Sequence, residues 1–177
     1  MTMLTTEEIK KLLQLQPNPQ EGGYFASTYT SAVQVPVGDL PGFSPASKQR
    51  SLCGAIFYLL DATGFSALHR VTGDMIYHFY GGHRVQMLLL NPDSGTHRSE
   101  TCIFGNDLAR NEIPMKVIPG GTWLGSRLMP GGDYALMGVT MAPGFDPFDY
   151  TIAKRKDLFE KYPDEKDREL IIALTRL

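Results

Sequence analysis

The sequence predicts a mainly β fold in which antiparallel strands close into a sandwich or barrel and helices lie only at the two ends. Three observations lead to this prediction. Short apolar, β-rich runs recur through the middle of the 177-residue chain. Gly, Pro, Asn and Asp separate these runs, and no helical periodicity lies between them. Helical patterns appear only in the first and last segments.

The first segment predicts a short helix. Thr5 and Glu8 have the spacing of a capping box, in which each side chain accepts a hydrogen bond from the other residue's backbone. Ile9 begins an apolar helix face, and Pro17 and Pro19 end the helix. The chain returns to helix in "AKRKDLFEKY" and, after a proline, in "DEKDRELIIALTRL".

Short strands are expected between these helical ends, from "GGYFASTYTS" onward. They include "LCGAIFYLL", "SALHRV", "MIYHFYG", "RVQMLLLN", "HRSETCIFG", "MKVIPGG", "TWLGSRL" and "YALMGVTMAP". The Gly-, Pro- and Ser-rich segment "VPVGDLPGFSPASKQ" is expected to be one long surface loop. Because the runs on both sides of this loop belong to one sheet system, residues 1–177 are expected to form a single domain.

Composition excludes several classes of partner. Hydrophobic residues make up 42% of the chain and charged residues 20%, and the net charge of −2 favours neither nucleic acid nor an anionic membrane. No apolar run is long enough to span a bilayer, and the first residues do not resemble a signal peptide. Cys53 and Cys102 have no metal-binding spacing and are expected to be two buried free thiols. A cytoplasmic location is expected.

The stretch "HRVTGDMIYHFYGG", residues 69–82, contains two of the four histidines and an aspartate. Histidine is both a common metal ligand and a common general base. Side chains two positions apart share one face of a strand, so if Asp74 faces the interior, His78 and Tyr80 do too. Tyr77 and Phe79 would then face outward.

Four segments together resemble one family. "EGGYFASTYTS", "FSALHRVTGDMIYHFYGG", "IPGGTWLGSRL" and "LMGVTMAPGFDPFDY" occur in the order typical of the DUF985, or cupin 5, branch of the cupin superfamily. The resemblance covers nearly the whole chain. It implies a jelly roll, or double-stranded β-helix, and a homodimer. In this superfamily the motif glutamate faces the barrel interior, and it falls near Asp74, so the resemblance implies that Asp74, His78 and Tyr80 face inward. Outward-facing Tyr77 and Phe79 would then provide a contact surface for that dimer.

Metal-binding cupins hold their ion with two histidines and a glutamate of a first motif and one histidine of a second. Placed on this chain, the first histidine is His69 and the glutamate falls near Asp74. The other two positions are Val71 and Leu124, which cannot bind a metal. The chain therefore departs from the metal-binding pattern.

Similarity to epimerase cupins implies a small polar ligand in the barrel, such as a sugar or sugar nucleotide. If the protein is an enzyme, we expect an isomerase or epimerase in which His69 is the general base, Asp74 orients it and Tyr80 returns the proton. The expected ligand-binding residues are His78, Trp123, Arg127, Glu21 and Tyr24.

Two other hypotheses stay open. A weakly held divalent metal at His69, Asp74 and His78 would make the protein a metal-dependent oxygenase or isomerase. Alternatively, the degraded motif would suit a cupin that binds a small molecule without catalysis.

We predict that no tightly bound transition metal is needed for folding, because Val71 and Leu124 offer no lone pair to a cation. Elemental analysis of protein purified without a metal column is expected to find well below one equivalent of Zn, Fe, Mn or Ni. About one equivalent, with a large fall in melting temperature on chelation, would contradict the prediction.

Overall fold

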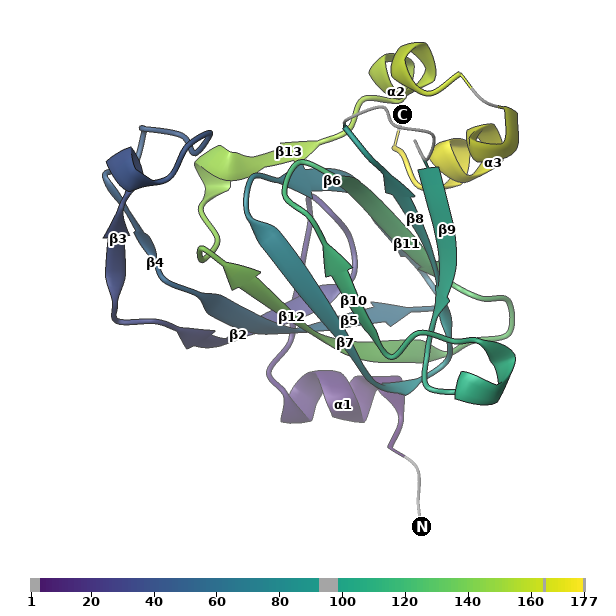
Figure 1. The fold of residues 1–177 in the computed structure, drawn as a ribbon. Coiled ribbons are helices and arrows are strands. Elements are labelled where there is room, and N and C mark those ends of the chain that lie inside the picture. Colours follow the sequence, from purple (N-terminus) through teal and green to yellow (C-terminus); the bar gives the residue numbers. More distant parts are fainter. Residues whose placement is uncertain (1–3, 93–98, 164, 177) are drawn as a thin grey trace.

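Two antiparallel sheets pack face to face in the computed structural model, which describes residues 4–92, 99–163 and 165–176 (Figure 1). The six-stranded sheet has the order β1-β2-β5-β12-β7-β10. Its strands are β1 (Gln16–Pro17), β2 (Tyr24–Thr30), β5 (Gly54–Asp61), β12 (Tyr134–Ala142), β7 (Asp74–Gly82) and β10 (Met115–Ile118). The five-stranded sheet has the order β13-β6-β11-β8-β9, formed by β13 (Tyr150–Ile152), β6 (Phe65–Val71), β11 (Trp123–Leu128), β8 (Val85–Leu90) and β9 (Ser99–Phe104). This arrangement confirms the mainly β, jelly-roll fold.

The helices lie where the sequence predicts them. The first is α1 (Thr6–Leu12), whose capping box between Thr5 and Glu8 is present, and the last two are α2 (Arg155–Lys161) and α3 (Glu165–Ala173). Three single turns of 3-10 helix lie in the connections, η1 (Val37–Asp39), η2 (Leu108–Arg110) and η3 (Pro147–Asp149). No helix in the described ranges is long and apolar enough to cross a membrane.

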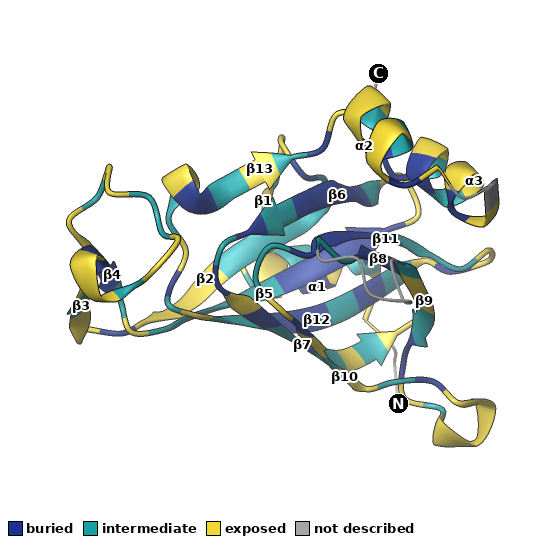
Figure 2. Ribbon diagram, turned by 45° about the horizontal axis from the view of Figure 1, so that its top comes forward, coloured by how far each residue is buried: buried dark blue, intermediate teal, exposed yellow. Residues whose placement is uncertain are grey.

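The main core lies between the two sheets, and Figure 2 shows the buried residues concentrated along central strands such as β6, β11 and β12. Smaller cores attach the helices to the outer sides of the sheets. Ile9 of α1 packs with Leu59 on the six-stranded sheet, and Leu158 of α2 and Ile171 of α3 pack with Leu68 on the five-stranded sheet. Isolated helices as short as these are unstable in water, so burial of their apolar faces against the sheets stabilises them.

Strand β7 faces the opposite way from the sequence prediction. Met75 and Tyr77 are buried in the core between the sheets, and Phe79 packs against that core. Asp74 and Tyr80 are exposed, and Tyr80 retains 55% of its accessible surface. The prediction that the even-numbered residues of β7 face inward is therefore wrong. It assumed that Asp74 points inward like the motif glutamate of other cupins, whereas Asp74 is exposed. Burial of Met75, Tyr77 and Phe79 removes more apolar surface from water.

This reversal also removes the surface argument for a dimer. Tyr77 and Phe79 are not available as an outward aromatic pair, since both pack against Phe104. The exposed apolar side chains near this edge of the sheet are instead Met115 and Val117 of β10. A homodimer stays a prediction from the family resemblance.

The segment predicted as one surface loop closes into an arm. Its ends pair as β3 (Gln34–Pro36) and β4 (Gln49–Ser51). Arg50 is buried between two carboxylates of the chain that leads into β13, with Nε 2.7 Å from Asp149 and Nη1 3.3 Å from Asp146. These two ion pairs hold the arm against the segment that precedes β13.

Cys53 and Cys102 are free thiols, as predicted, but they are half-buried rather than buried. Cys102 lies in β9, near the edge of the five-stranded sheet, where burial raises the pKa of its thiol. Cys53 lies between β4 and β5.

Lys10 fixes α1 to the sheet, and its replacement by Met is expected to lower the free energy of unfolding by about 1–3 kcal/mol. The Lys10 ammonium donates a 2.8 Å hydrogen bond to the buried carboxylate of Asp61. Burial alone raises the pKa of Asp61, but hydrogen bonds from Lys10 and Thr63 outweigh it and lower that pKa below 3.8.

A lowered pKa in the folded state stabilises the protein above pH 3.8 and loses this effect as pH falls through the folded value. The difference between Lys10→Met and the parent should therefore be full at neutral pH and shrink in acid below about pH 4. Urea unfolding across this range measures it, with the exposed Lys11→Met as control. An equal difference at pH 2.5 and pH 7 would contradict the role of Asp61.

Candidate functional site

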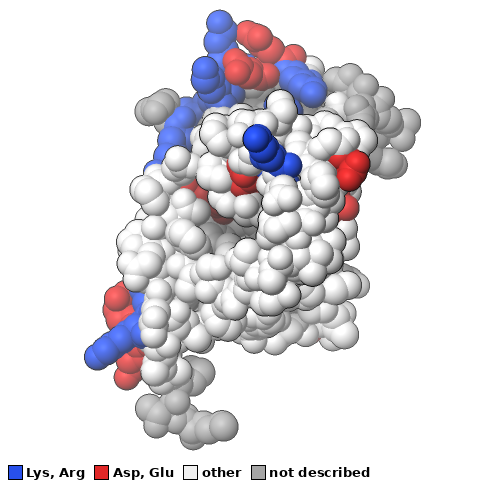
Figure 3. All heavy atoms as spheres, turned by 90° about the vertical axis from the view of Figure 1, so that its left-hand side faces the viewer, with Lys and Arg blue, Asp and Glu red and all other residues white. Residues whose placement is uncertain are grey.

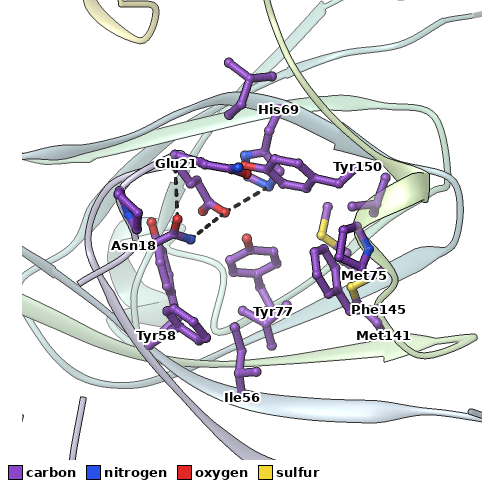
Figure 4. A pocket seen from close by; sticks show the side chains of 17 residues that line it. Asn18, Glu21, Ile56, Tyr58, His69, Met75, Tyr77, Met141, Phe145 and Tyr150 are labelled. Atoms are coloured by element: carbon purple, nitrogen blue, oxygen red, sulfur yellow. Dashed lines mark hydrogen bonds and ion pairs between the residues drawn. The ribbon is translucent and has the colours of Figure 1, made fainter. Parts of the chain in front are cut away.

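A cavity of about 830 Å³ lies between the two sheets, within the range of small-molecule pockets. Its rim includes the exposed residues Gln20, Phe145 and Pro147. Figure 3 shows a hollow on a face of the molecule that carries few charged side chains. The side chains of the cavity come from both sheets and from the loop before β2 (Figure 4).

His69 of β6 and Glu21 of the loop face each other at one side of this cavity. His69 is 2% exposed, and its Nδ1 lies 2.8 Å from the carbonyl oxygen of Ala67. Its Nε2 lies 3.8 Å from Oε2 of Glu21. Figure 4 shows this pair with Asn18, whose amide lies 3.4 Å from the same carboxylate. A base and a carboxylate, both buried, are thus held close to one another at one side of the pocket.

Two glycines let the Glu21 loop lie directly against the sheets. Gly22 has φ +103°, and a Cβ there would clash with the carbonyl oxygen of Phe65. Gly23 has φ +69°, and its Cβ would lie 2.7 Å from the carbonyl oxygen of Leu59. Only glycine adopts such a conformation at so close an approach without strain.

Hydrogen bonds then hold Glu21 in place. Its carbonyl accepts from the backbone N–H of Ala67 at 2.7 Å, and Oε1 of its side chain accepts from the hydroxyl of Ser66 at 2.7 Å. Its own N–H donates to the Asn18 side chain at 3.1 Å. Glu21 is therefore positioned by β6, the same strand that carries His69.

Three tyrosines surround the pair. Burial and the nearby charge of Glu21 raise the pKa values of Tyr58, Tyr77 and Tyr150. All three phenols consequently stay protonated and act as hydrogen-bond donors at neutral pH. Tyr58 donates to the carbonyl of Gly22 at 2.9 Å, which leaves Tyr77 and Tyr150 for a ligand.

Tyr150 has an unusual environment. Its ring stacks on His69, with centroids 5.5 Å apart and planes 25° apart. Its hydroxyl is the buried side-chain polar atom that, within the described residues, has no hydrogen-bond partner. Buried polar groups are nearly always paired, and an orphan in a pocket indicates a group kept for a ligand or for water.

Only two of the residues expected at the site line the cavity, His69 and Glu21. Asp74 is exposed at the start of β7, where its carboxylate accepts a hydrogen bond from the backbone of Gly120. His78 and Tyr80 lie on the outer face of β7, and Tyr80 packs edge-on against Phe57. The structure thus does not bring Asp74, His78 or Tyr80 to His69, because β7 turns its odd-numbered residues inward.

The other three expected ligand-binding residues also lie elsewhere. Trp123 is 9% exposed and packs in the core under α2, with the guanidinium of Arg70 4.7 Å from its ring. Arg127 donates a hydrogen bond to Gln86 on the neighbouring strand. Tyr24 packs near α1, with the Lys10 ammonium 3.8 Å from its ring centre. None of the three lines the cavity.

The sequence interpretation missed Tyr77, Tyr150 and Asn18. Tyr77 was placed on the wrong face of β7. Tyr150 follows "GFDPFD" directly, so that turn could have marked it, but its contact with His69 depends on the pairing of β13 with β6. Asn18 stands next to two prolines, where an Asn side chain commonly caps a turn.

The residues do not fit the metal that many cupins hold. His69 pairs with Leu124 on one neighbouring strand and with Ile152 on the other, so apolar side chains flank it in the sheet. Asp74 and His78 lie on other surfaces, as described above. No group of three His, Cys, Asp or Glu side chains within the described ranges could hold an ion. A site formed by His69, Asp74 and His78 is therefore not supported.

Comparison with known proteins places this jelly roll in a family. The family Cupin_5, described as the Cupin superfamily (DUF985), matches residues 7–153. An uncharacterized protein of Saccharomyces cerevisiae is 29% identical over 145 residues, covering 78% of this chain and 70% of the yeast protein.

Solved structures show the same architecture over the whole length. A protein of Shewanella oneidensis has a TM-score of 0.80 at 26% identity, covering 98% of this chain and 99% of that one. A hypothetical protein of Leishmania major has a TM-score of 0.84 at 25% identity, covering 98% and 100%. Oxalate decarboxylase of Bacillus subtilis shares the fold alone, with a TM-score of 0.51 at 14% identity over 90% of this chain and 37% of that enzyme.

The fold and its internal cavity define a cupin. The chain belongs to the DUF985, or cupin 5, family of the cupin superfamily, as its sequence motifs indicate.

Replacing Tyr150 with Phe is expected to leave the free energy of unfolding unchanged or to raise it by up to about 1 kcal/mol, because the change removes an unpaired buried hydroxyl. Tyr58→Phe is the matched comparison. It loses a hydrogen bond to Gly22 and should lower stability by about 1 kcal/mol. Urea unfolding measures both. A loss at Tyr150→Phe as large as that at Tyr58→Phe would show that the Tyr150 hydroxyl has a structural role.

Proposed function

We propose that this cupin binds a small carbonyl- or hydroxyl-bearing molecule in its cavity and catalyses a proton transfer on it, as an isomerase or epimerase does. The observation that carries the proposal is the orientation of His69. Nδ1 lies against the carbonyl of Ala67, which can only accept a hydrogen bond, so Nδ1 carries the hydrogen. In the neutral ring the lone pair is then on Nε2, which faces Glu21 and the cavity.

Glu21 supports the base rather than acting in its place. When Nε2 takes a proton, the ring becomes an imidazolium, and a carboxylate 3.8 Å away stabilises that charge. Glu21 is itself held by Ser66 and Asn18, so its position does not depend on the ligand. This role replaces the one expected for Asp74.

The phenols supply the acid side of the reaction. A base that removes a proton from carbon next to a carbonyl breaks the C–H bond and leaves the electron pair in an enolate. Neutral Tyr150 and Tyr77 would donate hydrogen bonds to the enolate oxygen, and such donors stabilise the developing charge. Return of the proton from Nε2 or a phenol to another carbon, or to the other face of the same carbon, would complete an isomerisation or an epimerisation.

A cupin that only binds its ligand remains the second hypothesis. The large apolar share of the cavity lining favours it, because an apolar wall contributes to affinity without taking part in proton transfer. The two hypotheses differ in one observable, the exchange of ligand protons with solvent.

His69→Asn is expected to abolish proton exchange while leaving the fold intact. In D₂O, NMR follows loss of the protons next to the carbonyl of cyclohexanone and of dihydroxyacetone. The parent should accelerate this loss for at least one probe, and removal of the base should slow it by roughly 100- to 10,000-fold. Stability should change by about 1 kcal/mol at most, because Asn keeps a polar group in the pocket.

His83→Asn is the matched control, since His83 is exposed at the start of the β7–β8 turn and does not line the cavity. It should leave both exchange and melting unchanged. Exchange at the parent rate in His69→Asn, or no acceleration by the parent with either probe, would contradict proton transfer and favour the binding hypothesis.

A further inference from the structure

We propose that the ligand of this cavity is uncharged and largely apolar, with its oxygen substituents at one end, and that phosphorylated ligands are excluded. This ligand differs from the sugar or sugar nucleotide that the sequence suggested, because a sugar carries hydroxyls around its ring and a sugar nucleotide carries phosphates. The inference rests on the part of the proposed function that puts a ligand in this cavity, and it is independent of proton transfer.

The charge of the lining carries the first step. Among the 17 residues that line the cavity there is no Lys or Arg, and Glu21 is the one carboxylate. A phosphate or carboxylate group of a ligand would therefore enter beside a like charge and find at most a shared imidazolium. Moving an anion out of water is unfavourable unless a cation or several donors meet it.

Two arginines, Arg50 and Arg176, lie near the cavity without lining it. Arg50, by the mouth, is buried, and its guanidinium contacts Asp149, Asp146 and backbone carbonyls. Arg176 is exposed, donates a hydrogen bond to the carbonyl of Pro19 and acts on Tyr150 through its charge, but it is not one of the lining residues. Recognition of phosphate commonly uses a bidentate Arg, a Lys or a helix N-terminus, and the described lining offers none of these.

The distribution of polar and apolar groups carries the second step. Figure 4 shows Asn18, Glu21 and the Tyr58 hydroxyl at one side of the cavity, and Met75, Met141 and Phe145 at the other. The remaining apolar lining includes Phe25, Ile56, Val71, Val139 and Ile152. A ligand with hydroxyls around its whole ring would bury several of them against this wall without partners. A ligand ring with its oxygen atoms at one end would place them beside the polar side of the cavity and its apolar end against the apolar side.

A matched set of probes tests the charge selection directly. The probes are 4-methylcyclohexanone, which is neutral, 4-oxocyclohexane-1-carboxylate, which has a similar ring and a negative charge, and the nucleotide dTDP. Protein carrying ¹³C in its methionine methyl groups reports on the cavity, because Met75 and Met141 line it. Met115, which is 55% exposed outside the cavity, is the internal control.

The neutral ketone is expected to shift the Met75 and Met141 signals saturably, and the two anionic probes should bind at least about tenfold more weakly. Glu21→Gln should reduce the difference in affinity between the ketone and the anionic probes. Glu100 is an exposed carboxylate of β9, and Glu100→Gln should leave that difference unchanged. Binding of either anion as tight as that of the ketone, or no cavity shift with any probe, would overturn the inference. Ketone binding without proton exchange would leave it intact and remove only the proposed catalysis.

Discussion

The contact between the Glu21 loop and strand β6 is the constraint on which the site depends. Gly22 and Gly23 let this loop approach the carbonyls of Phe65 and Leu59, one in each sheet. The loop thereby closes one side of the space between the sheets, and the hydrogen bond from Ala67 fixes its distance. Without that approach the sandwich would still have a core, but its cavity would lose the carboxylate that faces His69.

The same closure creates the electrostatic character of the cavity. One carboxylate, withdrawn from water and held by Ser66, lies among three phenols, and burial together with this charge raises their pKa values. The phenols therefore remain donors, and Tyr150 keeps an unpaired hydroxyl against the His69 ring. The cupin fold here holds hydrogen-bond donors and acceptors around His69. Val71 and Leu124, which are apolar, stand at two motif positions where metal-binding cupins have ligands. Fold and chemistry are separable in this way because the site depends on a few inward side chains.

The fold was predictable because its signals are local. Strand runs bounded by Gly and Pro and a capping box at Thr5 depend on neighbours in sequence, and the structure confirms them. The first helix ends earlier than predicted, at Leu12, with Gln14 at φ +53° and Pro17 already in β1. Family motifs supplied the jelly-roll connectivity and placed His69 and Glu21 among the candidates. The arm of β3 and β4 was missed because its pairing is short and its anchor, Arg50, finds its partners about a hundred residues away.

The sequence by itself determined the family, the helices and the longer strands, the pocket histidine and the loop carboxylate. Only the tertiary structure decided which face of β7 is buried, and with it that Tyr77 enters the cavity while Asp74, His78 and Tyr80 do not. Alternation along a strand says which residues share a face but not which face the core covers. That choice depends on the apolar surface of the opposite sheet, where Phe104 and Leu124 meet the odd-numbered side chains. Tyr150 reaches His69 for the same reason, since only the pairing of β13 with β6 brings them together.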